Sequence, residues 1–339
     1  MSMIQSMRGM IGDMYAVYAI DLGVELGLFD ELAASEEPVD IRELAERADC
    51  RANDDMLHGW MRAVQAAGIV NVDENNRVSF QGGWREALTD PTSTEYVATL
   101  PRCYIALAEA YPRFAELFRE GKSLPWQKLG KSVVEDISAD SLRAANFFIK
   151  AVVPRVPGLR EKLENGARVC DVGCSAGHMT IRLAEAFSSA RFVGIDPWQD
   201  AIDLAKQHAA EHGVADRVTF QMQCASELPG GTYDIVLLND VLHEMDQGLR
   251  VKALHAICGS LRKGGGLFFS DPIAPAAHSD FLKPSSRVPS ITLFFETPFG
   301  AKVHTRLELE RFLREAGFGA PTEIESTDTD ICVYLEPVR

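Results

Sequence analysis

The sequence predicts an α/β protein with a doubly wound, Rossmann-like sheet in its C-terminal half and a mainly helical N-terminal half. After residue 165, apolar strand-like runs alternate with amphipathic helical segments, and a glycine-rich turn follows the first of these runs. Before residue 165 the apolar residues recur mostly at helical spacing. With 339 residues, the chain is long enough for two domains of ordinary size.

The composition is that of a globular protein with an acidic balance. Hydrophobic residues make up 46% of the chain, so a substantial core can be buried. The formal net charge of −15 disfavours a nucleic-acid partner, because a polyanion would meet a repulsive field. No apolar run approaches the ~18 residues of a membrane-spanning helix, and no secretory leader is expected. The seven scattered cysteines therefore indicate reduced thiols in a cytoplasmic protein with no membrane partner.

The N-terminal half is predicted to contain helices and one pair of short strands. Apolar spacing of three and four residues predicts the helices, over 14–32, 41–47, 54–67, 96–119 and 142–163. Asp40 can cap the second of these helices, and a turn leads to the third. Two short strands, 69–72 and 77–80, then flank a polar turn. Helix, turn, helix and a two-stranded wing together predict a winged-helix module.

The C-terminal half is predicted to be a parallel sheet with helices on both faces. The strands are expected at 168–172, 191–195, 217–221, 233–238 and 265–270. The helices between them are expected at 176–187, 198–212 and 246–261. After Asp271 we expect a loop rich in Pro, Ser and Ala, then a helix over 305–316 and a hairpin within 321–336.

A glycine-rich turn carries the strongest functional signal. The first strand ends in Asp171, and Gly173, Ser175 and Gly177 follow at alternate positions. Small residues allow the backbone to pass close to a ligand in the crevice beyond the strand ends. Such a turn alone is weak evidence, because many nucleotide-binding folds use one. Asp196 strengthens it, because a carboxylate at the end of the second strand can accept the two ribose hydroxyls of an adenosine.

These residues resemble the motifs of class I S-adenosylmethionine-dependent methyltransferases. The turn from Asp171 to Gly177 is similar to the first motif, with Ser175 in place of the middle glycine. Residues 233–240 and 261–270 resemble two later motifs in the same order. The resemblance implies S-adenosylmethionine as the cofactor. NAD is the competing ligand, but it expects a third glycine where this chain has His178.

The resemblance also assigns roles to individual residues. Asp171 and the backbone around Gly173 would hold the methionine end of the cofactor, and Asp196 would hold the ribose. Trp198 would lie against the face of the adenine, and Cys224 and Ala225 would contact its edge. Asn239 would face the cofactor's amino group.

Residues 19–30 and the winged helix resemble the two-domain O-methyltransferases. This resemblance implies a dimerisation domain over 1–90, a helical linker over 91–164 that roofs the substrate site, and a methyltransferase domain over 165–339. It implies a homodimer that acts on a small-molecule methyl acceptor. The alternative is a winged-helix DNA-binding regulator, but helix 54–67 begins with Asp54 and Asp55 and carries one arginine, which disfavours phosphate contacts.

His243 is the candidate catalytic residue, because the matching histidine is the general base of plant-type O-methyltransferases. The alternative is that His243 acts through a neighbouring residue or caps a helix. The position of the family's orienting glutamate is matched here by Val303, and whether Glu296 substitutes for it stays open. This departure favours a thioether nucleophile, which has no proton to lose. Length, acidic balance and domain plan also resemble the bacterial methylthiohydroxybutyrate S-methyltransferases of dimethylsulfoniopropionate synthesis.

The preferred hypothesis is therefore S-methylation of a thioether acid such as methylthiohydroxybutyrate, with O-methylation of a phenolic or hydroxylated metabolite as the alternative. No metal is expected. Cys170 and Cys174 lack a second pair nearby, and His208 and His212, one helical turn apart, are predicted on a solvated helix face. Methionines recur at helical spacing from Met3 to Met14, which indicates a dimer or core stripe.

Overall fold

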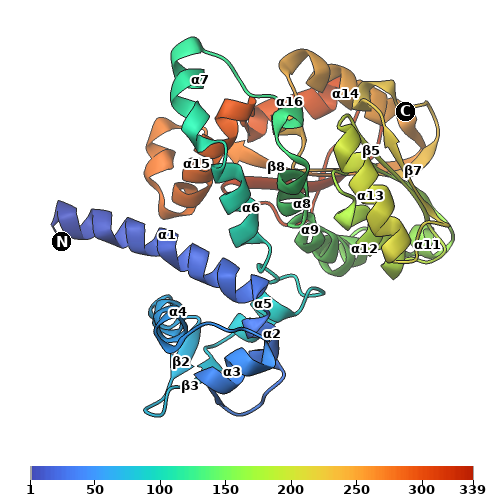
Figure 1. The fold of residues 1–339 in the computed structure, drawn as a ribbon. Helices are drawn as coiled ribbons and strands as arrows, with labels where there is room; N and C mark the ends of the chain where they lie inside the picture. Colours follow the sequence, from blue (N-terminus) through green and yellow to red (C-terminus); the bar gives the residue numbers. More distant parts are fainter. Residues whose placement is uncertain (1, 339) are drawn as a thin grey trace. The chain divides into compact units, whose positions relative to one another are not determined.

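The computed structural model describes residues 2–338 and divides into two compact units, Met1–Ile105 and Ala106–Arg339 (Figure 1). The predicted functional boundaries at residues 90 and 164 stay predictions. Within the described residues, no helix has both the length and the apolar character needed to cross a lipid bilayer.

The first unit is mainly helical with one small antiparallel sheet of strand order β1-β3-β2. Its elements are α1 (Met3–Glu25), α2 (Leu28–Ala33), β1 (Val39–Asp40), α3 (Ile41–Arg47), α4 (Asp54–Ala66), β2 (Val70–Val72), β3 (Arg77–Phe80) and α5 (Trp84–Thr89). Asp40 caps α3 as predicted, since its side chain accepts the backbone N–H of Arg42. The predicted helix 14–32 is wrong in its bounds, because Gly27 at φ +68° ends α1 and starts α2.

The second unit begins within α6 (Leu100–Ala108) and holds the large sheet. Its strands are β4 (Arg168–Val172), β5 (Arg191–Asp196), β6 (Val218–Met222), β7 (Tyr233–Asn239), β8 (Leu261–Ala274), β9 (His304–Thr305), β10 (Thr322–Glu323) and β11 (Asp330–Leu335). The strand order is β10-β11-β8-β7-β4-β5-β6, and β9 pairs with β8. Strands β4 to β8 are parallel, whereas β11 is antiparallel to β8 and pairs with β10 as a hairpin.

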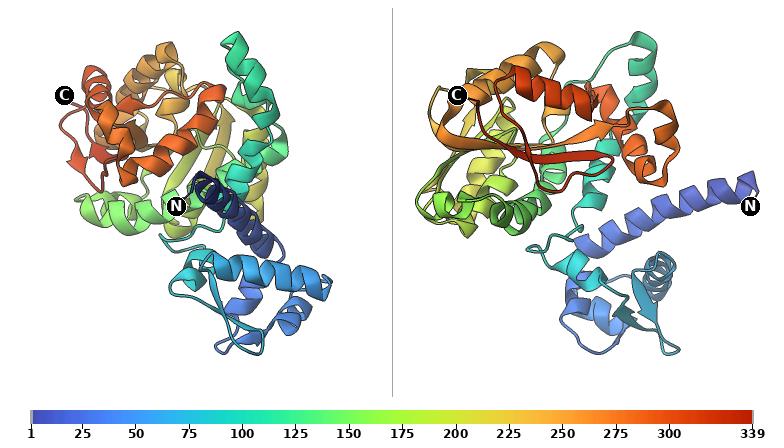
Figure 2. Two further views of the ribbon diagram at one scale, coloured as in Figure 1. Left: turned by 90° about the vertical axis from the view of Figure 1, so that its left-hand side faces the viewer. Right: turned by 180° about the vertical axis from the view of Figure 1, so that it is seen from behind.

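Helices cover both faces of this sheet (Figure 2). The helices of this unit are α7 (Phe114–Glu120), α8 (Lys131–Ser138), α9 (Ser141–Phe147), α10 (Val153–Arg155), α11 (Leu159–Glu164), α12 (His178–Ala186), α13 (Gln199–Glu211), α14 (Gln247–Ser260), α15 (Pro284–Glu296) and α16 (Arg306–Glu315). Alternate strand residues face opposite sides: Val169 packs in one apolar cluster with α12, and Cys170 in another with α14 and α16. This alternation is the physical basis of the predicted fold class, which is confirmed.

Several predicted element bounds are wrong, and proline or glycine explains most of them. The predicted helix 96–119 is broken around Pro112, and the predicted helix 142–163 ends before Pro157 and Gly158, which has φ +73°. A loop was predicted after Asp271, but β8 continues to Ala274 and α15 follows. Pro284 lies at the first helical position of α15, where its missing N–H costs nothing, and Pro289 inside the helix obscures the pattern.

Candidate active site at the carboxyl ends of the strands

The glycine-rich loop after β4 is fixed to the end of the neighbouring strand. The backbone N–H groups of Gly173 and Cys174 both donate to the carbonyl of Ile195, at 2.8 and 3.1 Å. Gly173 has φ +74°, and a Cβ built there would lie 2.6 Å from a methyl carbon of Val241. Ser175 also adopts a left-handed φ of +46°. The loop therefore has room for hydrogen only at Gly173 and holds a serine in a conformation that glycine usually occupies.

Gly177 closes this loop and precedes α12. Its φ is +83°, and a Cβ there would lie 2.6 Å from the Phe220 ring. The sequence-based prediction that this turn needs small residues thus has a steric reason in the structure at both of its glycines.

Asp196, at the end of β5, is held by two backbone N–H groups. Its Oδ1 accepts from Trp198 at 2.9 Å and its Oδ2 from Ser175 at 3.1 Å. Burial raises the pKa of this carboxyl, and the two backbone N–H donors oppose the shift. Each oxygen keeps a further lone pair, so the fixed carboxylate can still accept hydroxyl groups.

Asp171 lies beneath the loop rather than on its open side. Its side chain is buried and accepts a hydrogen bond from the Thr180 hydroxyl at 2.5 Å. Burial raises its pKa to about 6, against the opposing effect of the Thr180 hydrogen bond. In this structure Asp171 braces the first turn of α12, and its predicted contact with a methionine group stays a prediction.

The other predicted cofactor residues gather near the same edge. The N–H of Gln223 donates to the carbonyl of Asp196 at 3.0 Å, which brings Cys224 and buried Ala225 beside the end of β5. Asn239 ends β7 in register with Ser270 of β8. Their predicted cofactor contacts are not tested by this geometry.

Trp198 is buried against apolar side chains. It packs with Val134 of α8, Ala176 of the loop and Leu204 of α13, while Trp126 lies against the same cluster. The indole therefore lies next to the glycine-rich loop, and its predicted stacking on adenine remains a prediction.

His243 is buried between two carboxylates. Its Nδ1 lies 3.0 Å from Oδ1 of Asp271, and its Nε2 lies 3.2 Å from Oε2 of Glu296. Burial by itself lowers the pKa of the imidazole, but Asp271 and Glu296 outweigh it and hold that pKa well above its ordinary value. Val303 supplies no carboxylate, so the ring is paired with Glu296 and with Asp271, which sequence reasoning missed. Asp271 could have been found, because it follows Ser270, the β8 partner of Asn239.

The backbone around His243 is anchored by a buried arginine. Arg250 is 2% exposed, and it donates from Nε to the carbonyl of Leu242 at 3.0 Å and from Nη2 to that of Met245 at 2.6 Å. The N–H of Lys302 donates to the carbonyl of His243 itself at 2.7 Å. The segment that carries the histidine is therefore held on both sides.

Further carboxyl groups surround His243. Burial raises the pKa of Glu244 to about 8, opposed by His243 and reinforced by Glu296. Loss of solvation likewise raises the pKa of Asp240 to about 7, although Asp240 is an exposed residue just after β7, at the carboxyl ends of the strands. This edge therefore carries an excess of acid groups, a favourable setting for a positively charged ligand.

Aromatic side chains cluster beside Glu296. Phe294 and Phe295 of α15 pack against Phe114, at ring-centroid distances of 6.2 and 5.6 Å. Phe299 stacks on Trp126 at 4.5 Å with an angle of 23° between the rings. The aromatic residues of α15 are not among the predicted site residues, because the sequence after Asp271 predicts a loop.

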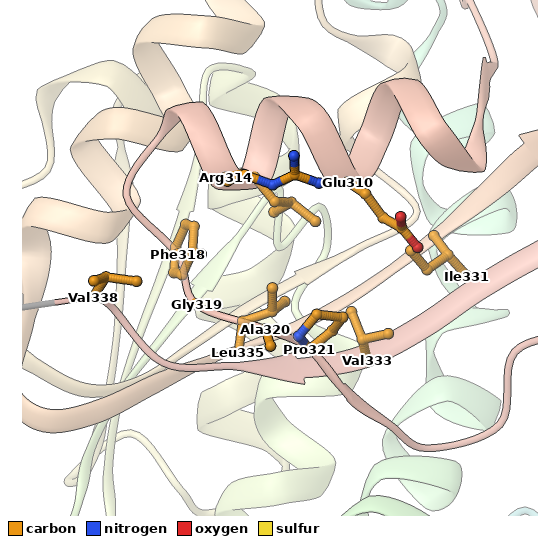
Figure 3. A pocket seen from close by; sticks show the side chains of 11 residues that line it. Glu310, Arg314, Phe318, Gly319, Ala320, Pro321, Ile331, Val333, Leu335 and Val338 are labelled. Carbon is orange, nitrogen blue, oxygen red and sulfur yellow. The ribbon is translucent and has the colours of Figure 1, made fainter.

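A separate surface pocket of about 370 Å³ lies between α16 and β11 (Figure 3). Its walls are mostly apolar, with Glu310 and Arg314 at one side. The predicted site residues do not line it. We therefore place the candidate active site at the strand ends and not in this pocket.

The prediction that His208 and His212 share a solvated helix face is wrong for His208. Only 13% of the His208 side chain is exposed, and its Nδ1 lies 3.0 Å from the carbonyl of Ala176 in the glycine-rich loop. His212 is half exposed and pairs with Glu185 at 2.8 Å. Packing of α8 onto this end of α13 buries the first histidine and leaves the second outside.

Residues 163–317 match a family model described as a methyltransferase domain. The second unit contains a class I, S-adenosylmethionine-dependent methyltransferase domain. The cofactor S-adenosylmethionine, predicted from the first motif, is thereby confirmed for this methyltransferase domain.

Curated relatives and solved structures agree with this assignment. The chain is 35% identical over 107 residues to the ubiquinone biosynthesis O-methyltransferase of Methylocella silvestris, covering 31% of this chain and 39% of that enzyme. It is 27% identical over 236 residues to the 27-O-demethylrifamycin SV methyltransferase of Amycolatopsis mediterranei, covering 68% and 78%. Human N-acetylserotonin methyltransferase, solved with S-adenosylmethionine, is similar in fold: TM-score 0.66, 17% identity, and 99% and 98% coverage.

Proposed function

We propose that this methyltransferase acts on a small thioether acid such as methylthiohydroxybutyrate and forms a sulfonium product. The acceptor's sulfur lone pair attacks the methyl carbon of S-adenosylmethionine, and the bond from that carbon to the cofactor's sulfonium breaks. S-adenosylhomocysteine leaves as a neutral thioether, and the positive charge moves to the product. No proton is released in this step, so no general base is needed.

The placement of His243 between Asp271 and Glu296 carries this proposal. Two carboxylates raise the pKa of this imidazole and favour its protonated form, and a protonated ring cannot accept a proton from an acceptor. Nδ1 faces Asp271, and Nε2 lies 3.2 Å from Oε2 of Glu296, so an acceptor hydroxyl would have to displace Glu296 to reach Nε2. On this proposal His243 is a positioning residue that joins β8 and α15 at the reacting end of the site.

The surroundings also suit a sulfonium product. Aromatic faces and carboxylates attract cations, and the cluster of Phe114, Phe294, Phe295 and Phe299 lies next to Glu296. The acceptor's own carboxylate needs a cation, and we assign Arg143 of α9 to it. Arg143 also pairs with Asp140, with Nη2 3.5 Å from Oδ2, and its charge opposes the rise in the pKa of Asp240.

O-methylation is the second candidate, and the contact between Nδ1 of His243 and Asp271 favours it. A carboxylate on Nδ1 is the arrangement that orients a histidine as a general base. The named relatives from Methylocella and Amycolatopsis are O-methyltransferases or act at an O-methyl position. This function requires Glu296 to leave Nε2 when the acceptor binds.

A radiolabelled-cofactor screen tests the choice. The full-length protein is incubated with labelled S-adenosylmethionine and with matched sets of thioether acids, phenols and hydroxy acids. We expect transfer to a thioether acid and a higher KM for that acid, without a higher cofactor Kd, in Arg143→Gln. Transfer to oxygen acceptors alone contradicts the proposal.

We further propose that the protein is a homodimer through α1. The helix leaves large apolar side chains in solvent within the described chain, with Met3 78%, Ile4 66% and Met7 58% exposed. Light scattering of the full chain should give a dimer, and Met7→Glu with Met10→Glu should give monomers. A wild-type chain that runs as an active monomer contradicts this proposal.

A further inference from the structure

Three side chains on separate helices of the second unit bring metal-ligating atoms together outside the candidate active site. Glu135 belongs to α8, His178 begins α12, and His208 lies on α13. Figure 1 labels these three helices. Oε1 of Glu135 lies 3.4 Å from Nε2 of His178, and its Oε2 lies 3.4 Å from Nε2 of His208. One donor atom from each residue lies within 4.8 Å of the other two. We propose that these three residues bind a divalent transition-metal ion, with Zn²⁺ the best match.

The spacing of the donor atoms fits a shared ion. Bonds of about 2.0–2.2 Å at tetrahedral angles place neighbouring ligand atoms roughly 3.3–3.6 Å apart. The 3.4 Å contacts of His178 and His208 end on different oxygens of Glu135, Oε1 and Oε2. One donor atom from each residue lies within 4.8 Å of the other two, so a small rotation of the side chains brings all three onto one ion. Two imidazoles and one carboxylate form a three-ligand set for Zn²⁺, and the fourth position is then filled by water.

The hydrogen-bond partners favour an ion over direct pairing. A carbonyl can only accept, so Nδ1 of His208, 3.0 Å from the carbonyl of Ala176, must carry the proton in the neutral ring. In that form its Nε2 lone pair faces Oε2 of Glu135 at 3.4 Å, so two acceptors face each other unless a second proton or a metal ion lies between them. Oε2 of Glu135 and Nε2 of His178 are both buried without a hydrogen-bond partner. A metal ion satisfies all of these atoms together.

The site lies where it would fasten α8 to the glycine-rich loop. His178 directly follows Gly177 of the loop, and the proton of His208 is held by the loop carbonyl of Ala176. Val134, beside Glu135, packs on Trp198. The ion would thus tie together three helices around the loop. This inference rests on these contacts and not on the identity of the methyl acceptor.

Cobalt titration of the chelator-treated, full-length protein tests the proposal. We expect one Co²⁺ per chain with the visible absorption of a tetrahedral site, displaced by one equivalent of Zn²⁺. Each of Glu135→Gln, His178→Gln and His208→Gln should weaken Co²⁺ binding by at least roughly 10–100-fold, the loss typical even of a second-shell change. His212→Gln is the matched control and should bind Co²⁺ like the wild type. His212 lies one turn after His208 at the end of α13, and it pairs with Glu185 of α12 instead of Glu135.

The seven thiols of the chain are the competing ligands, and the spectrum separates them. Thiolate ligation to Co²⁺ adds a charge-transfer band in the near ultraviolet, which a site of two histidines and one glutamate lacks. Sulfur bands, binding that is equal in wild type and the three variants, or no stoichiometric binding would each overturn the proposal. If a variant fails to fold, the wild-type protein alone still tests the proposal. Its Co²⁺ spectrum shows whether sulfur ligates the ion, and its stoichiometry shows whether one ion binds per chain.

Discussion

His243 and Glu296 are paired across two distant segments of the chain, with Nε2 of the histidine 3.2 Å from Oε2 of the glutamate. The histidine lies in the short turn after β7, whereas the glutamate ends α15. Because Asp271 contacts the other ring nitrogen, two carboxyl groups raise the pKa of the imidazole and favour its protonated form. Substitution of His243 therefore distinguishes S-methylation from O-methylation.

The first prediction concerns His243→Gln. With a thioether acceptor, we expect a loss through positioning, mainly in KM, and a kcat that stays flat between pH 6 and pH 8. A general base contributes about 10²–10⁴-fold to the rate, so an oxygen-directed enzyme should lose that factor in kcat. Steady-state kinetics over this pH range distinguish the two. A kcat that collapses in the variant, together with a wild-type rate that falls as the pH is lowered through the raised pKa of His243, would rule out the S-methylation hypothesis.

The second prediction concerns protons released on cofactor binding. Burial raises the pKa of Asp171 to about 6, of Asp240 to about 7 and of Glu244 to about 8, so these groups are partly protonated near neutral pH. A sulfonium favours the carboxylate form and lowers these pKa values, so protons leave and affinity for S-adenosylmethionine rises from pH 6 to pH 8.

S-adenosylhomocysteine is the matched control for this experiment, because it differs in lacking the sulfonium charge and the methyl group. Calorimetry in buffers of different ionisation enthalpy should show more protons released with S-adenosylmethionine. Equal release for the two ligands at pH 7 would mean that these carboxyl groups do not sense the reacting charge.

The third prediction concerns Asp196→Ala. Removing this fixed carboxylate takes away a charged acceptor for ribose hydroxyls, which should weaken S-adenosylhomocysteine binding by roughly 1–3 kcal/mol. Calorimetric titration measures the change. Glu211→Ala at the end of α13 serves as the control, since Glu211 is exposed and its carboxylate accepts a hydrogen bond from Gln207 of the same helix. Unchanged affinity in Asp196→Ala would remove the proposed ribose contact.

The fourth prediction compares two glycines. Gly173→Ala places a methyl group 2.6 Å from Val241 on a backbone with φ +74°, and we expect a destabilisation of about 1–3 kcal/mol. Gly259→Ala in α14 meets no atom within 4 Å and should stabilise by about 0.4–1 kcal/mol. Chemical denaturation measures both. Equal effects of the two substitutions would contradict the tight packing of the loop.

The sequence predicted the parts of this fold that depend on local pattern. The strands and helices alternate as expected. The motif from Asp171 to Gly177 and the acid at Asp196 lie at the carboxyl ends of the strands as expected. These features repeat over short distances, so hydrophobic periodicity and turn chemistry are enough to find them.

The parts that failed depend on contacts between distant segments. Pro289 hid α15, and with it the approach of Glu296 to His243. Asp271 looked like the start of a loop, although β8 carries it to the end of the sheet beside His243. His208 was assigned to solvent because its helix alone gives no sign of α8. Local periodicity contains no information about which side chain a second helix will cover.

The open apolar surface of α1 has a consequence for how the protein behaves in dilute solution. Apolar side chains between Met3 and Leu22 are exposed to water in the single chain. A second chain that covers them binds the folded N-terminal unit and not its unfolded form, so dimerisation stabilises the folded unit. We expect the melting temperature of the N-terminal unit to rise with protein concentration. Specific activity should then depend on how far a stock has been diluted, and assays at nanomolar enzyme would measure a different population from assays at micromolar enzyme.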